Sequence, residues 1–246
     1  MSPSLSRLVL DKMFTAGRVT AAGPISPRLR GVTVTGPDVR GLGWTPGQQV
    51  RLLVGEPFAL RTWTSRQIGD VLRTYSVRRL AGDSFDLVGF DHGGDGPGER
   101  WFREAEPGRE VLFRGPEGGF VIDAAAPYHL FAGEETATVA FAAMLDALPP
   151  DAAVHGAVEA GDAADHQDLA RDLVRVDRGD VPAASSEALL KAVASLDLPD
   201  APGTAYLAGE ARTIQAIRAH LVRERGWDRR NVRTKPFWTP GKRGLD

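Results

Sequence analysis

The first half of the chain alternates apolar and polar positions in short runs, which glycine and proline residues separate. Alternation with a period of two sends successive side chains to opposite faces of a β-strand. We therefore predict strands at 48–54, 71–80, 83–92 and 108–115. Short strands at this spacing, with turn residues between them, predict an antiparallel β-barrel.

From Tyr128 onward the pattern changes to apolar runs followed by helical repeats. Residues 128–133 are typical of a short buried strand, and apolar residues then recur at helical spacing from Ala137 to Leu148. We also predict strands at 152–160 and 204–209 and helices at 185–196 and 210–226. Strands that alternate with helices predict a doubly wound parallel sheet.

The two patterns meet at residues 123–127, where the sequence AAAP interrupts both of them. We therefore expect two domains, residues 1–124 and residues 127–246. A chain of 246 residues with 42% hydrophobic content is long and apolar enough to form a core in each of them.

Composition excludes several classes of function. The chain has no cysteine, which rules out disulfides, thiolate nucleophiles and cysteine-ligated zinc or iron–sulfur centres within it. Its five histidines lack metal-ligand spacing, so we predict no metal site. The formal net charge of -2 gives no reason to expect nucleic acid as a partner. Since no apolar run reaches about 18 residues and the N-terminus does not resemble a signal peptide, we expect a cytoplasmic protein without membrane insertion.

The segment RTYSVR carries two guanidinium groups, a phenol and a hydroxyl on one predicted strand. On a regular strand Arg73 and Tyr75 share one face, and Ser76 and Arg78 share the other. The tyrosine could stack on a flat aromatic ligand, the serine could bond a ring nitrogen, and an arginine could bind a diphosphate. The alternative is a half-buried core tyrosine flanked by solvated arginines.

A glycine-rich segment, His92 to Gly98, follows the next predicted strand and opens a short helical stretch. Such a turn offers free backbone N–H groups and the positive end of a helix dipole, and both suit a phosphate. Glycine equally permits a long hairpin loop, so this segment alone leaves two interpretations open.

In their order and spacing these features resemble the siderophore-interacting protein family, a branch of the ferredoxin-reductase-like flavoproteins. The resemblance extends over nearly the whole chain, at 73–78, 92–101, 107–120, 131–141, 206–226 and 237–244. The first and last of these segments are the most specific. Ferredoxin-reductase-like proteins in general share only the first, so the terminal tryptophan motif and the helix before it select this branch.

The resemblance implies that the first domain binds FAD and that the second binds NADH or NADPH. In the family's flavin motif, which Arg73, Tyr75, Ser76 and Arg78 match, the tyrosine packs on the isoalloxazine, the hydroxyl lies near its reactive nitrogen and arginine engages phosphate. The other matching positions are His92, Gly96 and Pro97 in a loop around FAD, Gly115, Pro116 and Gly118 in a turn beside it, Thr136 in the nicotinamide-side motif, and Trp238 near the flavin. The implied catalytic residues are Tyr75, Ser76 and Trp238.

The chain departs from the family pattern at several positions. Ser76 replaces a commoner threonine and keeps its hydroxyl, whereas Phe237 replaces a usual tyrosine and loses one. Glu117 adds an anion that would weaken diphosphate binding. The stretch 58–70 is longer than expected before the flavin strand, and we have no physical account of it.

The start of the second domain lacks the GxGxxG fingerprint of dinucleotide-binding sheets. Residues 133–136 read GEET, and two carboxylates there would repel a pyrophosphate while satisfying a helix dipole. Ordinary charges at the start of a helix explain them as well as a cofactor role does.

The end of the chain is cationic around Trp238, through Arg233, Lys235, Lys242 and Arg243. If this segment lies over the flavin, its charges would attract an anionic ferric chelate, and we predict it as the substrate-binding group. A solvated tail is the alternative.

Together these expectations describe an NAD(P)H-dependent flavoprotein reductase whose substrate is a ferric siderophore and whose product is Fe(II). Two other functions stay open. One is a general flavoprotein reductase that passes electrons to a protein partner, and the other is a non-enzymatic flavin or siderophore carrier. The electron donor is NADH, NADPH or a separate reducing protein.

Overall fold

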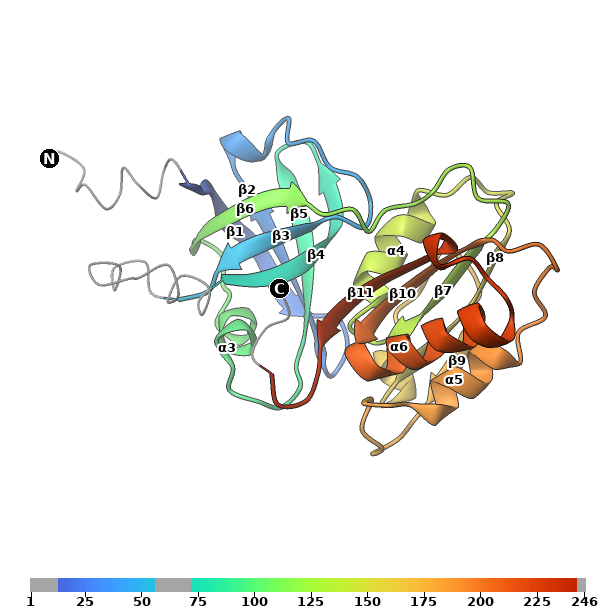
Figure 1. Cartoon of the computed structure of the whole chain (residues 1–246). Coiled ribbons are helices and arrows are strands. Elements are labelled where there is room, and N and C mark those ends of the chain that lie inside the picture. Colours follow the sequence, from blue (N-terminus) through green and yellow to red (C-terminus); the bar gives the residue numbers. More distant parts are fainter. Residues whose placement is uncertain (1–12, 56–71, 243–246) are drawn as a thin grey trace, which may run out of the picture. The chain divides into compact units, whose positions relative to one another are not determined.

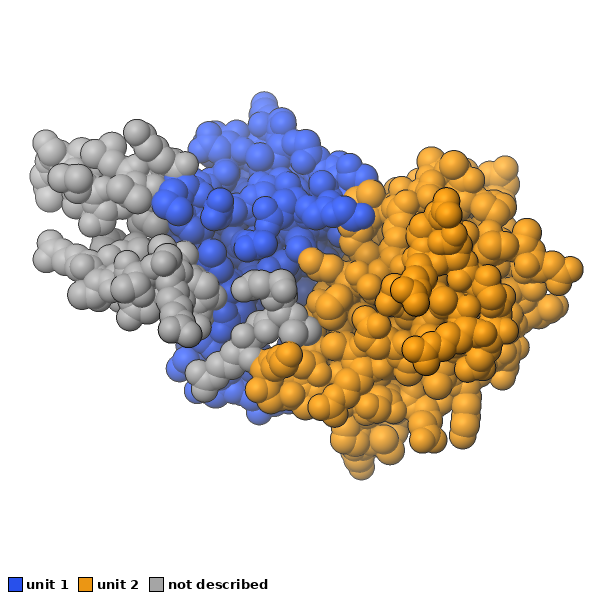
Figure 2. All heavy atoms as spheres, viewed as in Figure 1, with its two compact units in different colours: residues 1–119 blue, residues 120–246 orange. Residues whose placement is uncertain are grey.

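The computed structural model describes residues 13–55 and 72–242 (Figure 1). The stretch 58–70, noted above as unusually long, and Arg243 lie outside the described residues. The chain divides into two compact units, residues 1–119 and residues 120–246 (Figure 2).

Unit 1 is a closed barrel in which neighbouring strands run antiparallel, in the order β1-β2-β5-β4-β3-β6. The strands are β1 (Thr15–Pro24), β2 (Leu29–Thr35), β3 (Gln49–Leu53), β4 (Leu72–Ala81), β5 (Ser84–Phe90) and β6 (Glu110–Glu117). A single turn of 3₁₀-helix, η1 (Pro37–Val39), and the short helix α3 (Pro97–Arg103) connect them. The predicted antiparallel barrel is confirmed, although β1 and β2 were not predicted.

Alternation explains how the barrel fills its interior. Val32 and Val34 of β2, Phe85 and Leu87 of β5 and Phe113 of β6 are all buried in one cluster, each strand contributing every second residue. The residues between them face outward, as the pleat of a strand requires. β1 was not predicted because its polar outward residues and its glycine and alanine residues give only a weak apolar pattern.

Unit 2 is a parallel sheet in the order β11-β10-β7-β8-β9. The strands are β7 (His129–Glu134), β8 (Val154–Ala160), β9 (Val174–Asp177), β10 (Thr204–Glu210) and β11 (Val232–Trp238). The helical segments are α4 (Thr138–Asp146), η3 (Ala163–Asp165), α5 (Glu187–Ala194), α6 (Ala211–Ala219), the short π-helix η4 (His220–Glu224) and η5 (Arg229–Asn231). From β7 the chain continues to β8 and β9 on one side, and from β10 it continues to β11 on the other. The switch point of the sheet therefore lies between β7 and β10, at the carboxyl ends of these strands.

Helices cover both faces of the sheet, so the predicted doubly wound arrangement is confirmed (Figure 1). Phe141 and Met144 of α4 pack on one face, whereas Leu189 of α5 and Ile214 of α6 pack on the other. The last strand, β11, was expected only as a tail. It forms instead the edge of the sheet beside β10.

Within the described residues, no helix is both long and apolar enough to cross a membrane.

Phe131 lies at the centre of the face that α4 covers. Its ring is fully buried, stacks on Tyr206 with centroids 5.0 Å apart, and meets the edge of Phe141 at 5.2 Å. One side chain thus joins β7, β10 and α4, and the packing of this face depends on it.

We expect Phe131→Ala to lower the free energy of unfolding of unit 2 by about 3–5 kcal/mol, because it removes buried surface and leaves a cavity. Chemical denaturation measures this, with Val181→Ala, at a side chain 64% exposed, as a control that should change little. A loss below about 1 kcal/mol for Phe131→Ala would contradict this packing.

Candidate functional site

The motif RTYSVR lies on β4, in the wall of the barrel between β3 and β5. Tyr75 pairs with Val50 of β3 and packs against the barrel core, as does Val77 two residues later. The register then shifts between Val77 and Arg79, so that Arg78 is the extra residue of a bulge. Simple alternation therefore does not determine the side on which Arg78 lies, and its sharing a face with Ser76 stays a prediction.

Tyr75 is held by the helix that follows the glycine-rich loop. Its ring meets the edge of Phe102 with centroids 4.8 Å apart. Its hydroxyl lies against Gly98, where an added Cβ would be only 2.2 Å from the Tyr75 oxygen. Burial raises the pKa of Tyr75 above its ordinary value, with the charge of Arg73 acting in the opposite direction. Tyr75 is thus a neutral aromatic group at physiological pH.

Four N–H groups of the glycine-rich loop are already bonded to carboxylates of the chain. The N–H groups of His92, Gly94 and Gly96 donate to the Glu99 carboxylate at 3.2, 3.2 and 2.9 Å, and that of Gly93 donates to Asp91 at 2.8 Å. Glu99 belongs to α3 and reaches back over the start of its own helix. The Gly96–Glu99 spacing, typical of a capping interaction, could have revealed this.

Another turn of the predicted site, at the end of β6, has geometry that only glycine adopts readily. Gly115 has φ +98° and Gly118 has φ +108°, and an added Cβ at Gly115 would be 3.0 Å from the carbonyl oxygen of Gln49. Between them, Glu117 forms an ion pair with Arg51 at 2.6 Å. The anion that was expected to oppose a diphosphate is therefore balanced by a cation on β3.

In unit 1, the residues of β4 fit a flavin dinucleotide better than the glycine-rich loop does. On β4, Arg73, Tyr75 and Ser76 are each partly exposed and combine a cation, a ring and a hydroxyl. In the loop, three N–H groups that could meet a phosphate are already bonded to Glu99. The residues of β4 are therefore the better candidates for contact with FAD.

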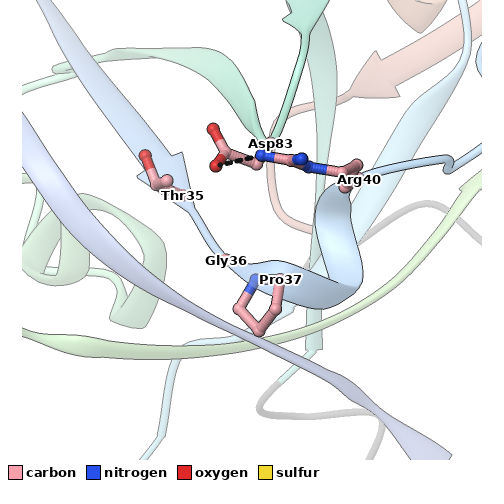
Figure 3. A pocket seen from close by; sticks show the side chains of 5 residues that line it. All are labelled: Thr35, Gly36, Pro37, Arg40 and Asp83. Atoms are coloured by element: carbon pink, nitrogen blue, oxygen red, sulfur yellow. Dashed lines mark hydrogen bonds and ion pairs between the residues drawn. The ribbon is translucent and has the colours of Figure 1, made fainter.

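A shallow hollow elsewhere on the barrel lies between the end of β2 and the β4–β5 turn (Figure 3). Thr35, Gly36, Pro37, Arg40 and Asp83 line it, and Arg40 and Asp83 form an ion pair across it at 3.3 Å. It includes none of the predicted site residues.

In unit 2 the carboxyl ends of the strands carry glutamates. Among the described residues, four glutamates are buried, and all lie at this edge: Glu134, Glu135, Glu159 and Glu210. Gly133, just before them, is a packing residue of β7, since an added Cβ would be 2.3 Å from the Ala208 carbonyl oxygen. Gly133 thus lies within β7, and the chain turns only after Glu134.

One arginine balances two of these carboxylates. Arg178, directly after β9, donates both terminal nitrogens to Glu135, and it lies 3.6 Å from Glu159. Ser186 donates its hydroxyl to Glu159. Burial raises the pKa of Glu159, and the serine and the arginine limit that rise. Sequence reasoning missed Arg178 because nothing local marks a residue 43 positions from Glu135 as its partner.

Thr136, which matches the nicotinamide-side motif, donates both its N–H and its hydroxyl to Glu134. Trp238 also donates to Glu134, from its indole nitrogen at 3.0 Å. Burial, together with the charge of Glu135, raises the pKa of Glu134 to about 7. The threonine and the tryptophan singled out in the sequence thus meet at one buried carboxyl group.

Arg233, one residue of the predicted cationic group, is already bonded within unit 2. Arg233 donates to Asp123 at 3.0 Å and to the Val121 carbonyl, and it lies beside Tyr206 near the start of β11. Its charge is therefore already balanced within unit 2. Lys235 lies on the same strand and Lys242 is exposed beyond it. Over residues 13–55 and 72–242, no group of three or more histidine, aspartate and glutamate side chains could hold a metal ion.

We expect Glu99→Ala to lower the free energy of unfolding of unit 1 by about 1 kcal/mol, because the loop N–H groups lose a charged acceptor. Amide hydrogen exchange at His92, Gly94 and Gly96 should become faster. Glu104→Ala, at a side chain 65% exposed, is the control. Unchanged exchange at Gly96 would show that Glu99 does not hold the loop.

Arg178→Met should destabilise unit 2 by about 3–5 kcal/mol at neutral pH, because it leaves buried carboxylates without their cation. A buried carboxyl whose folded-state pKa is raised stabilises the fold below its ordinary pKa and loses that contribution as pH rises. The deficit of the variant should therefore grow from about pH 4.5 upward. Arg175→Met, at a side chain 54% exposed, should change little. Equal deficits at pH 5 and pH 8 would contradict this account.

Comparisons with known proteins agree with this geometry. Residues 18–120 match the model of the siderophore-interacting FAD-binding domain, and residues 126–241 match that of the siderophore-interacting protein family. The crystal structure of a siderophore utilization protein from T. fusca is 28% identical, with a TM-score of 0.81 over 95% of each chain.

Two curated relatives match over about two thirds of their own length. An uncharacterized protein of Mycobacterium tuberculosis is 31% identical over 196 residues, which are 74% of this chain and 66% of the relative. The ferric vibriobactin reductase ViuB of Vibrio cholerae is 29% identical over 178 residues, or 70% of this chain and 66% of the relative. With both units matched, the chain belongs to the siderophore-interacting protein family, and its barrel is a siderophore-interacting FAD-binding domain.

Proposed function

We propose that the chain is an FAD-dependent reductase that takes hydride from NADH or NADPH and passes electrons singly to ferric iron held in a siderophore. The observation that carries this proposal is the placement of Arg73, Tyr75 and Ser76 together on β4 of an FAD-binding barrel. The similarity to a ferric vibriobactin reductase supports the choice of substrate. We assign FAD binding to residues 1–124 and nicotinamide binding to residues 127–246.

In this proposal, each group on β4 contributes a different contact. Tyr75 offers a neutral aromatic face to the isoalloxazine, and Ser76 bonds a ring nitrogen through its hydroxyl. Arg73 and Arg78 supply the cations that a diphosphate needs, since Glu99 engages the loop N–H groups. His92, Gly96, Pro97, Gly115, Pro116, Gly118 and Thr136 stay predictions for cofactor contact.

FAD, when bound, accepts two electrons as a hydride and can release them one at a time. Two ferric ions are therefore reduced for each hydride, with release of one proton. Fe(II) binds hard oxygen donors less tightly than Fe(III), so that reduction loosens the metal from its chelator. The chain needs no nucleophile of its own for this chemistry.

The carboxyl edge of unit 2 supports the nicotinamide part of the proposal through its position in the sheet. Open α/β sheets bind dinucleotides at such a switch point. The glutamates there would repel a pyrophosphate, but Arg178 balances Glu135, and the pKa of Glu134 is raised to about 7. For the anionic ferric chelate, the cationic residues Arg233, Lys235, Lys242 and Arg243 stay a prediction, which the pairing of Arg233 with Asp123 weakens.

An anaerobic titration tests the whole function. The purified protein is loaded with FAD, NADH or NADPH is added, and a ferric siderophore follows together with an Fe(II)-specific chelator. We expect bleaching of the flavin by at least one donor, then its reoxidation with formation of Fe(II). A preparation that takes up no FAD would overturn the proposal. Bleaching without Fe(II) would favour a reductase that serves a protein partner.

Arg73→Ala should weaken FAD binding about tenfold or more, because it removes a charge-assisted contact with phosphate. Fluorescence titration of the flavin-free protein measures this. Arg79→Ala provides a matched control, since Arg79 lies on the same strand and is exposed. Equal FAD affinity in Arg73→Ala and wild type would remove Arg73 from the site.

A further inference from the structure

The end of β11 is held by two buried glutamates on neighbouring strands. The indole nitrogen of Trp238 donates to Glu134 at 3.0 Å, and the hydroxyl of Thr239 donates to Glu210 at 3.0 Å. Glu134 is the last residue of β7 and Glu210 is the last residue of β10. The two residues are 2% and 0% exposed, respectively. Two consecutive residues are thus fixed by two separate acceptors.

Glu134 accepts three hydrogen bonds from uncharged donors. Besides the indole, the N–H of Thr136 donates at 2.9 Å, and the Thr136 hydroxyl donates to the same oxygen as the indole. An ionised carboxylate accepts at both oxygens, whereas a protonated one must use an oxygen to carry a donor. The ionised group therefore accepts this set of bonds best, because protonation adds an O–H donor to a carboxyl group that three donors already face.

The backbone of β10 keeps the Glu134 carboxylate in this position. Gly209 has φ +113°, and an added Cβ there would be 2.5 Å from the Glu134 oxygen that the indole bonds. A larger residue would displace the carboxylate from the indole. The glycine thus makes room for the contact.

The charged groups around Glu134 act in opposite directions: Glu135 disfavours its ionised form, whereas Arg178 attracts the ionised carboxylate. Glu135, the next residue, adds a negative charge, and Arg178 from the end of β9 gives its hydrogen bonds to Glu135. Glu159 on β8 and Glu210 on β10 are further carboxylates at the same edge. Burial and Glu135 together raise the pKa of Glu134 to about 7.

Glu210 differs from Glu134 in that its pKa is lowered, although both residues are buried at the same edge of the sheet. Burial acts to raise its pKa, but the N–H groups of Thr213, Arg212 and Ser185 bond the carboxylate and hold the pKa below its ordinary value. Its bond to Thr239 is consequently insensitive to pH in the neutral range.

We propose that Glu134 is a positioning residue for Trp238, fixing the indole at the end of β11 as a carboxylate and releasing it on protonation, while Glu210 keeps Thr239 in place. The relevance of this hold to the reaction rests on the proposed function and on the prediction from the family resemblance that Trp238 lies near the flavin. The hold itself is a property of unit 2 and is testable without flavin.

The test follows the indole N–H signal of Trp238 by NMR in the full-length protein between about pH 5 and pH 9. Loss of one signal in Trp238→Phe assigns it among those of the five tryptophans. We expect the signal to titrate with a midpoint near 7 in the wild type. It should be independent of pH in Glu134→Gln, which cannot ionise, and Thr239→Ala should leave the midpoint unchanged.

Thr136→Val provides a second variant in case Glu134→Gln fails to fold. The Thr136 hydroxyl lowers the pKa of Glu134, so its removal should move the midpoint upward, which a merely structural role would not do. The proposal is overturned if the wild-type signal is independent of pH, or if it titrates identically in Glu134→Gln or Thr136→Val.

The consequence for the reaction is measured separately, in protein loaded with FAD. The rate of flavin reduction should follow pH with the same midpoint as the indole signal, and Glu134→Gln should lose that dependence. If no flavin binds, the proposed function fails while the NMR result stands. If flavin binds and is reduced but the indole does not titrate, only the inference about Glu134 fails.

Discussion

The burial of carboxyl groups at the carboxyl edge of the parallel sheet is the constraint on which unit 2 depends. Each buried charge must be paired, hydrogen-bonded or neutralised. The chain uses all three solutions: Arg178 pairs with Glu135, backbone N–H groups bond Glu210, and a raised pKa favours protonation of Glu134. Glu134 is the last residue of β7 and Glu210 is the last residue of β10. Their hydrogen bonds to Trp238 and Thr239 connect these strand ends to the end of β11.

A related arrangement occurs in unit 1. The glycine-rich loop offers N–H groups of a kind that usually meet a phosphate, yet Glu99 of the following helix accepts them. In unit 1, therefore, a carboxylate of the chain bonds N–H groups that the sequence offered to a phosphate. The cations of β4, Arg73 and Arg78, are then the principal candidates for contact with a flavin diphosphate. We therefore expect the affinity for FAD to depend mainly on residues of β4.

Much of the fold follows from the sequence because local patterns persist in it. The barrel strands β3 to β6 alternate clearly, and β7 with α4 shows an apolar run followed by a helical repeat. β9 has only four residues, mostly exposed, and β11 carries charges at alternate positions, so neither shows such a pattern. The RTYSVR motif could be placed on a strand, but not the bulge at Arg78. Contacts between distant residues were out of reach, such as Arg233 with Asp123, 110 positions apart.

The central physical claim is that three of the buried glutamates, Glu134, Glu159 and Glu210, differ in pKa because their surroundings differ. A carboxyl-detected NMR titration of protein carrying ¹³C-labelled glutamate, assigned with single Glu→Gln variants, tests it most directly. The account predicts that Glu134 titrates near pH 7, that Glu159 titrates above the ordinary range, and that Glu210 titrates below it. Titration of all three together near the ordinary glutamate value of about 4.3 would contradict it.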